Sequence, residues 1–310
     1  MALNFIDLFA GCGGLSEGFL TAGGYKALAH VEWDLPMVNT LRHRLVKRWG
    51  HTPTEATKRV VHFDVQKTSE LLQGNWSDES KKLYSSDNYS DLPLHGLDSI
   101  IGKDSVDLII GGPPCQAYSL AGRAQDPFSM KKDYRNYLFE SFVKIVDHYK
   151  PKMFVFENVT GLLSACPGDT PIRQRIYDAF NEIGYEILSP GEMHKAIYCS
   201  VDFETPQCRN RVIIFGVRKG GNITLAQLYD SLDMQKQKAP PLTVRDAIGN
   251  LPKFKPLPHP VKQGRSNVSH EAVGDRYIPL HVARYHSPRD ISVFKEWLSK
   301  DMNCASTEEK

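Results

Sequence analysis

The stretch Val106-Asp107-Leu108-Ile109-Ile110-Gly111-Gly112-Pro113-Pro114-Cys115-Gln116 decides the fold, because it leads from a buried strand directly into a loop that carries one thiol. The apolar run at residues 106–110 is typical of a strand buried on both faces of a parallel sheet. Two glycines allow a sharp turn, and two prolines remove backbone freedom and amide donors. We therefore expect Cys115 on a stiff loop beyond a strand end, where open α/β sheets bind their ligands.

Short apolar runs alternate with longer helical or polar stretches along most of the chain. This alternation predicts an α/β fold with a doubly wound, mostly parallel sheet covered by helices on both faces. The predicted strands are residues 5–9, 27–31, 60–63, 106–110, 153–156 and 212–217.

Four sequence blocks, each at a predicted strand end, follow one another along the chain. They are FIDLFAGCGG at residues 5–14, PPCQ at 113–116, ENV at 157–159 and QCRNR at 207–211. In this order they resemble the first, catalytic, sixth and eighth motifs of the DNA cytosine-5 methyltransferase family, and four ordered matches are far more specific than any one of them. The resemblance covers about residues 4–252. It implies a Rossmann-like methyltransferase fold that uses S-adenosylmethionine, and by family habit a prokaryotic restriction-modification role.

The first block has the physical features of a cofactor loop. The strand ends at Phe9, glycines follow, and residues 15–20 begin a helix whose N-terminal amides face the ligand. Glu32 comes 18 residues after Gly14, about the separation at which an acidic residue on the second strand holds ribose hydroxyls. Trp33 then offers a flat face for an adenine ring.

The resemblance implies a set of S-adenosylmethionine-binding residues around these positions. Asp64 suits an acceptor for the adenine amino group, although a solvated aspartate at a strand end is the open alternative. The full set is Phe9, Gly11, Gly13, Gly14, Glu32, Trp33, Asp64, Val65, Pro113 and Leu138.

The other blocks supply what cytosine methylation requires. Carbon 5 of cytosine is a poor nucleophile, so a thiolate, here Cys115, must first add to carbon 6. Addition is easier when ring nitrogen 3 is protonated or hydrogen-bonded, a task for Glu157 with a raised pKa in a desolvated pocket. Arg211 is expected to contact the cytosine carbonyl oxygen, while Arg209 positions the loop or a phosphate and Asn158 braces the loop. The sequence does not identify the base that removes the carbon 5 proton.

The proposed chemistry requires a cytosine that has left the DNA stack, because carbon 6 is attacked from the face of the ring. Residues 116–123 resemble the mobile loop that closes over the flipped base in this family. Ser119 and Arg123 are candidate phosphate contacts to duplex DNA, and for Arg123 a solvated loop charge is an equal alternative.

Composition sets looser bounds on the class of protein. The chain has 310 residues, 41% hydrophobic content and a formal charge of +2, enough for one sizeable α/β domain and a smaller piece. Six cysteines without regular spacing, no leader-like segment and no long apolar run indicate a reduced, soluble, cytoplasmic protein without a membrane span. No cysteine pair or histidine cluster indicates a metal site.

The domain organisation is expected to be a catalytic and cofactor-binding domain at residues 1–252, followed by a linker and the start of a target-recognition region at 253–310. Residues 66–104 are expected to form a polar surface insertion. Residues 253–300 hold nine Lys or Arg against four Asp or Glu, which suits phosphate contacts or a solvated tail equally.

The family's ninth and tenth motifs are not found after residue 252. A fragment, a truncated gene and one subunit of a divided enzyme are the alternatives. We favour a catalytic subunit that acts with a second polypeptide carrying the missing motifs and the recognition region, because separated domains associate where their interface was once intramolecular.

Three other functions stay open at this point. A tRNA cytosine-5 methyltransferase of the same family is disfavoured by Tyr118 and Ser119 after the catalytic Cys-Gln. A non-catalytic S-adenosylmethionine- or DNA-binding subunit is disfavoured by the intact Cys115, Glu157 and Arg211. A nicotinamide enzyme would leave the proline-cysteine loop unexplained.

Overall fold

The structure is a computed structural model, and it describes residues 2–86, 89–90, 92–93, 95–114, 138–166, 169–237, 240–263, 266–274, 278 and 285–299. The chain divides into two compact units, Met1–Pro241 and Leu242–Lys310. The predicted boundary of the catalytic domain, after residue 252, stays a prediction.

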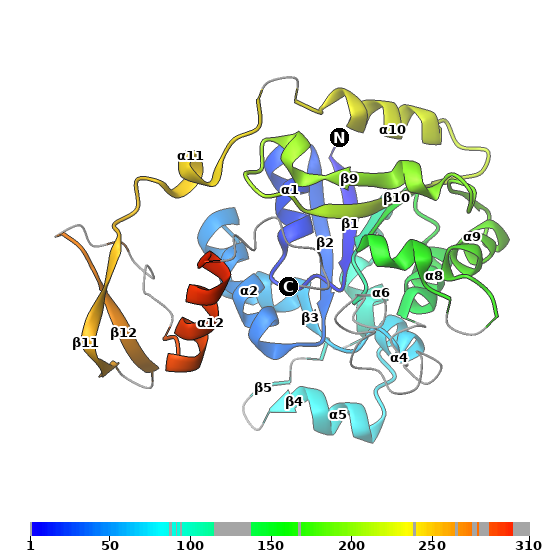
Figure 1. The fold of residues 1–310 in the computed structure, drawn as a ribbon. Helices are drawn as coiled ribbons and strands as arrows, with labels where there is room; N and C mark the ends of the chain where they lie inside the picture. Colours follow the sequence, from blue (N-terminus) through cyan, green and yellow to red (C-terminus); the bar gives the residue numbers. More distant parts are fainter. Residues whose placement is uncertain are drawn as a thin grey trace. The chain divides into compact units, whose positions relative to one another are not determined.

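The first unit is built on one sheet in the strand order β3-β2-β1-β6-β7-β10-β8, with β9 also paired to β10 (Figure 1). The neighbours from β3 to β7 are parallel, and β10 is antiparallel to β7, β8 and β9. The predicted fold class and all six predicted strands are confirmed, whereas the short strands β8 and β9 were not predicted. The strands are β1 (Leu3–Leu8), β2 (Tyr25–Glu32), β3 (Val60–His62), β6 (Leu108–Gly111), β7 (Met153–Asn158), β8 (Tyr185–Glu186), β9 (Ile197–Cys199) and β10 (Asn210–Arg218).

Helices cover the sheet, and most of them lie between two strands in the sequence. The α-helices of this unit are α1 (Gly14–Ala22), α2 (Leu35–Trp49), α3 (Pro53–Arg59), α4 (Thr68–Gln73), α5 (Asp78–Tyr84), α6 (Gly96–Ile101), α8 (Leu138–Tyr149), α9 (Ile172–Glu182) and α10 (Leu225–Met234). Short 3-10 turns are η2 (Thr160–Ser164), η3 (Met193–Ala196) and η4 (Ser200–Phe203), and β4 (Ser85–Ser86) pairs with β5 (Tyr89–Ser90).

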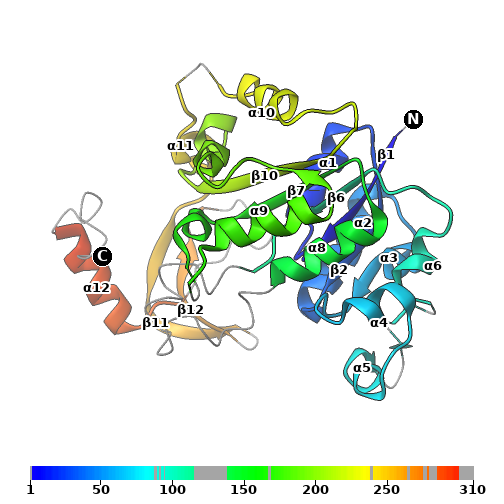
Figure 2. The same cartoon turned by 90° about the vertical axis from the view of Figure 1, so that its right-hand side faces the viewer.

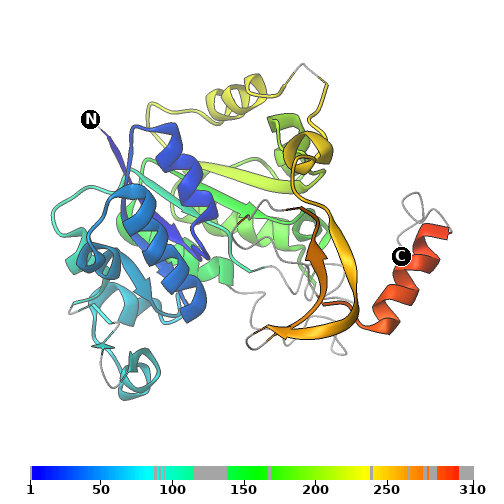
Figure 3. The same cartoon turned by 90° about the vertical axis from the view of Figure 1, so that its left-hand side faces the viewer.

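Both faces of the sheet are buried, because successive side chains of a strand point to opposite faces. On one face, Phe154 of β7 packs against Phe142 of α8 and Phe180 of α9, with ring centroids 5.8 and 4.1 Å away. Figure 2 shows α8 and α9 side by side in front of the strands. On the other face, Phe5 of β1 contacts Phe19 of α1 at 5.9 Å, and α1 is the blue helix on that side in Figure 3.

The segment at residues 66–104 is partly core, so the expectation of a surface insertion is wrong at its two ends. Helices α4 and α6 bury Leu71, Leu72, Leu97 and Ile101 in the main hydrophobic cluster. These residues stand in two short groups, Leu71-Leu72 and Leu97 with Ile101, inside a segment rich in Ser, Asp, Asn and Lys. That polar composition hid their burial.

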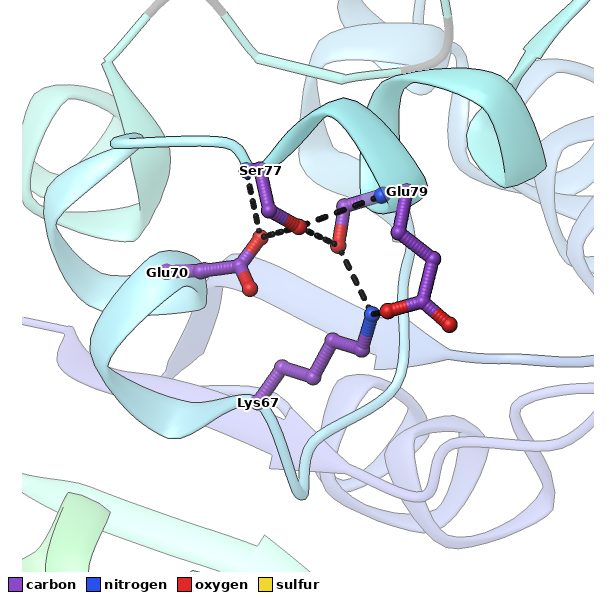
Figure 4. Close-up of polar contacts among 5 residues, drawn as sticks. Lys67, Glu70, Ser77 and Glu79 are labelled. Atoms are coloured by element: carbon purple, nitrogen blue, oxygen red, sulfur yellow. Dashed lines mark hydrogen bonds and ion pairs between the residues drawn. The ribbon is translucent and has the colours of Figure 1, made fainter.

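A polar network explains how the middle of this segment folds (Figure 4). The Lys67 ammonium donates to Glu79 Oε2 and to Ser80 Oγ, both at 3.0 Å, and Ser80 is fully buried. Ser77 donates its amide to Glu70 Oε2 at 3.0 Å and its hydroxyl to Ser80 Oγ at 3.1 Å. These contacts tie the start of α5 to α4 and satisfy the buried Ser80, while Ser77, Asp78 and Glu79 are exposed.

The described residues of the second unit form two helices and a two-stranded antiparallel sheet. They are α11 (Val244–Ile248), β11 (Phe254–Gln263), β12 (Ser266–Ala272) and α12 (Pro288–Ser299). Among the described residues, no helix is long and apolar enough to cross a membrane.

Candidate functional site

A cavity of about 390 Å³ opens beyond the carboxyl ends of β1, β2, β3 and β6. The strand order reverses between β1 and β6, and such switch points are where open α/β sheets bind ligands. The lining residues are Phe9, Gly11, Val31, Glu32, Trp33, Asp34, Met37, Phe63, Asp64, Val65, Gln66, Gly112, Pro114 and Leu138.

Most of the residues that the sequence assigns to the cofactor meet at this cavity. Phe9, Gly11, Glu32, Trp33, Asp64, Val65 and Leu138 line it. Gly14 lines a neighbouring cavity instead, and Gly13 and Pro113 line neither. Met37 and Gln66 are additional lining residues that carry no motif and were missed.

The turn after β1 has an unusual backbone at its first residue. Phe9 has a φ of 57°, which costs a residue with a Cβ about 1–3 kcal/mol and sets its ring at the cavity wall. Gly13 has a φ of 80°, and a Cβ there would lie 2.5 Å from Leu41 Cδ1 of α2. Gly13 is thus required for helix packing rather than for approach to the cavity.

Glu32 ties the glycine loop to the end of β2. Its Oε2 accepts from the Gly11 amide at 2.8 Å, and its Oε1 accepts from the amides of Trp33 and Asp34, each at 2.9 Å. The residue is buried, yet a carboxylate has about four acceptor positions and three are used. Glu32 therefore braces the cavity and retains capacity for a ligand hydroxyl.

The adenine-binding candidates lie on either side of this acid. Trp33 is 57% exposed at the cavity, so a face of its indole is open to a ligand. Asp64 accepts the Gln66 amide on Oδ1 at 2.9 Å, and this contact holds the carboxylate at the end of β3. Both observations suit the roles expected by resemblance, which remain predictions.

A second cavity, of about 360 Å³, shares Phe9 and Gly112 with the first and is also lined by Asp7 and Glu157. Asp7 is 1% exposed and accepts the Ser16 hydroxyl on Oδ2, while its Oδ1 has no hydrogen-bond partner among the described residues. An unpartnered buried carboxylate oxygen marks a place for a donor from a ligand. Sequence reasoning missed Asp7, although an aspartate inside the apolar run FIDLF was a usable signal.

Glu157 and Arg211 form an ion pair at the end of β7. Arg211 Nε lies 2.7 Å from Glu157 Oε1, and the two side chains are 22% and 31% exposed. Burial raises the pKa of Glu157, and the guanidinium of Arg211 opposes that rise. The result is a carboxyl group that takes up a proton more readily than an ordinary glutamate, beside a fixed positive charge.

The backbone before Cys115 is fastened to the same strand end. The Asn158 side-chain amide donates to the Pro113 carbonyl at 3.1 Å, and Asn158 Oδ1 accepts from the Val159 amide at 2.9 Å. Asn158 is 3% exposed, so this contact is shielded from water. This contact suits the bracing role expected of Asn158, which stays a prediction.

Three predicted residues, Cys115, Ser119 and Arg123, lie outside the described residues. Arg209 is exposed, and its carbonyl accepts from the Ser200 amide at 3.0 Å. In the part of the chain that the structure describes, no group of three or more His, Cys, Asp or Glu side chains could hold a metal ion.

Comparison with known proteins identifies the family to which the sequence is similar. The sequence matches the family described as C-5 cytosine-specific DNA methylase over residues 3–72 and 63–279. The type II methyltransferase M.Bpa9945I of Bacillus paralicheniformis is 37% identical over 282 residues, which cover 81% of this chain and 61% of that protein. M.AquIA of Picosynechococcus, also a type II methyltransferase, is 32% identical over 83% of this chain and 92% of its own length.

A solved structure agrees on the fold. A prophage-encoded E. coli protein described as a DNA modification methyltransferase superposes with a TM-score of 0.55 at 24% identity, covering 96% of this chain and 69% of that protein. The chain spans about three fifths of the length of M.Bpa9945I. Because the family match extends over most of the sequence, the chain belongs to the C-5 cytosine-specific DNA methylase family.

Proposed function

We propose that this chain is the catalytic part of an enzyme that transfers a methyl group from S-adenosylmethionine to carbon 5 of a flipped cytosine in duplex DNA. The observation that carries the proposal is the Glu157–Arg211 ion pair. Its acid, Glu157, lines the cavity that adjoins the switch-point cavity and lies beside Gly112, in the loop that leads to Cys115. An acid with a raised pKa at that position suits proton donation to a base.

The residues of the two cavities fit S-adenosylmethionine. Glu32 has an acceptor position for a ribose hydroxyl, Trp33 an open ring face for adenine, and Asp64 an acidic oxygen at the cavity wall. Asp7, with an unpartnered buried oxygen in the adjoining cavity, suits the ammonium group of the methionine part. When bound, the cofactor supplies an electrophilic methyl group.

The chain's own residues would activate the cytosine. The Cys115 thiolate forms a bond to carbon 6, and the ring electrons move toward carbon 5 while Glu157 donates to ring nitrogen 3. Arg211 holds the Glu157 carboxyl and contacts the cytosine carbonyl oxygen. Once carbon 5 carries the methyl group, a base removes its proton, the sulfur–carbon 6 bond breaks and the Cys115 thiolate is restored.

Duplex DNA would be held by residues around this loop. Ser119 and Arg123 follow Cys115 in the sequence and would contact phosphates, as would the exposed Arg209. The cytosine would leave the stack before it reaches Cys115.

We also propose that a second polypeptide supplies the target-recognition region. The support is the similarity to the type II methyltransferase M.AquIA, of which this chain covers 92%, against 61% of M.Bpa9945I. A divided enzyme would keep catalysis on this chain and base recognition on its partner.

The test is transfer of labelled methyl groups from S-adenosylmethionine to duplex DNA, by the chain alone and after co-expression with the product of the adjacent reading frame. Activity only in the mixture would support the divided enzyme, and activity of the chain alone would refute it. Transfer to tRNA but not to duplex DNA would favour the RNA branch of the family. Cofactor binding without any transfer would indicate a non-catalytic subunit.

A glycine pair provides a second test of the site. In Gly112→Ala the new Cβ would lie 2.7 Å from Glu157 Oε2, so the carboxylate must move away. We expect methyl transfer to fall about 100-fold, as for a misplaced catalytic group, with little change in the melting temperature. In Gly111→Ala the Cβ would lie 2.5 Å from the backbone oxygen of Leu8, which cannot move aside.

Gly111→Ala is therefore the control that fails by unfolding, and thermal melting separates the two variants. Full activity in Gly112→Ala would mean that the observed position of the Glu157 carboxylate is not the one used in the reaction.

A further inference from the structure

Two cysteines outside the proposed site lie beside each other at the edge of the sheet. Cys199 is the last residue of β9 and Cys208 precedes β10, and their sulfur atoms are 3.6 Å apart. Cys208 is exposed and Cys199 is half-buried, so small reagents can reach the pair. Eight residues lie between the two cysteines, and no sequence motif marks them as a pair.

The backbone holds the two thiols in this position. Cys199 is paired with Asn210 in the antiparallel ladder, and the Ser200 amide donates to the Arg209 carbonyl at 3.0 Å. The Ser200 hydroxyl also donates to the Gln207 carbonyl. Residues 200–207 therefore form a closed loop whose two ends are hydrogen-bonded at the cysteines.

The thiols lie on the face of the ladder opposite to the catalytic candidates. Directly opposed residues of an antiparallel pair share a face, and residues two apart on a strand share a face. Cys199 is paired with Asn210, so these two side chains share one face of the ladder. Arg211 is paired with Tyr198, and these two share the other face. A bond between the cysteines can thus form without contact with the Glu157–Arg211 pair.

We propose that Cys199 and Cys208 are a thiol modification site, at which a low-molecular-weight disulfide oxidises the pair to an intramolecular disulfide. One cysteine thiolate attacks the reagent disulfide and forms a mixed disulfide, releasing one small thiol. The second cysteine thiolate attacks the protein sulfur of that mixed disulfide, which forms the Cys199–Cys208 bond and releases the second small thiol. The two cysteine protons pass to the two released thiolates, and the small disulfide is the species reduced.

The geometry requires only side-chain adjustment. The sulfur atoms must approach from 3.6 Å to the bonding distance of about 2.05 Å, which is within the reach of rotation about the Cβ bonds. The hydrogen bond with Cys199 raises the pKa of Cys208, so the reaction should be faster in mildly alkaline than in neutral solution. The product would fasten the loop at residues 200–207 to the strand that carries Arg211.

The experiment incubates the purified, fully reduced chain with oxidised glutathione at mildly alkaline pH, blocks free thiols with an alkylating agent and maps the peptides by mass spectrometry. We expect peptides with Cys199 and Cys208 to be recovered as one cross-linked species that a dithiol reductant separates, while exposed Cys12 is recovered alkylated or as a mixed disulfide. Recovery of Cys199 and Cys208 as separate alkylated or glutathionylated peptides would overturn the proposal.

Single variants provide the matched control. In Cys199→Ser we expect Cys208 to stop at the mixed disulfide with glutathione, and in Cys208→Ser the same for Cys199. A trivalent phenylarsenical binds by bridging two neighbouring thiols. The Cys199→Ser and Cys208→Ser variants should each bind less of it than the unmodified chain, and Cys12→Ser should bind the same amount. An unchanged stoichiometry in both single variants would show that the two sulfurs do not act as a pair.

Discussion

Replacing Glu157 with glutamine is expected to lower methyl transfer to DNA by about 10²–10⁴-fold, the usual contribution of a positioned acid or base. The glutamine side chain has almost the same shape but cannot pass a proton to a cytosine ring. Labelled-methyl transfer at saturating DNA and cofactor, with a separate measurement of cofactor binding, gives the result. Cofactor affinity should change little, because glutamine keeps the shape of Glu157 and the groups assigned to the cofactor are Glu32, Trp33, Asp64 and Asp7.

A matched control is Glu192→Gln, which removes the same charge from an exposed pair with Lys195. That variant should keep the activity of the unmodified chain. If Glu157→Gln instead weakened cofactor binding, Glu157 would have a structural role in the cavity, and unchanged transfer would exclude it from the chemistry.

The pH dependence of methyl transfer should reflect the titration of the Glu157 carboxyl group. Burial raises the pKa of Glu157 against the opposing effect of Arg211, so the protonated form persists to higher pH than for an ordinary glutamate. Activity that requires the protonated form is present below this raised pKa and is lost as the pH rises through it. In Glu157→Gln this loss should disappear, because no group titrates at that position.

Replacing Cys115 with serine is expected to abolish methyl transfer while the chain stays folded and still binds the cofactor. A serine hydroxyl is far less nucleophilic than a thiolate at neutral pH, so the bond to carbon 6 does not form. DNA that contains 5-fluorocytosine gives a direct assay, because fluorine replaces the proton that must leave carbon 5 and the adduct persists. The unmodified chain, with its partner where required, should form a stable complex with this DNA, and Cys115→Ser should not.

The control is Cys166→Ser, which alters another exposed thiol and should leave the stable complex unchanged. Stable complex formation by Cys115→Ser would assign the nucleophile to another residue. Loss of the fold in Cys115→Ser would assign a structural role to the thiol.

The six predicted strands could be found because each lies in a mostly apolar run of four to six residues between polar stretches. The two short strands β8 and β9 could not, since two or three residues carry no periodic signal. Helix α10 lies within a polar stretch, residues 219–241, that contains no apolar run of the kind that marks the strands. Thr224 and Gln227 form a capping box there, a local pattern that predicts a helix start even where the composition is polar.

The candidate site could be predicted only where a motif marks the residue. Glu32 and Asp64 follow strand ends in recognisable blocks, and they line the cavity as expected. Met37 reaches the cavity from α2, and Asp7 reaches the adjoining cavity from inside a strand. Such placements depend on how helices and strands pack in three dimensions, which a linear pattern does not contain.

The antiparallel direction of β10 has a consequence for the newly made chain. The acid of the ion pair, Glu157, is at the end of a parallel strand, whereas Arg211 is at the start of the antiparallel strand beside it. A ribosome that has released residues 1–157 has therefore made the acid and the lining residues of the switch-point cavity but not the guanidinium. Because a domain folds as a unit, Glu157 stays without this partner until β10 has been made and joins the sheet.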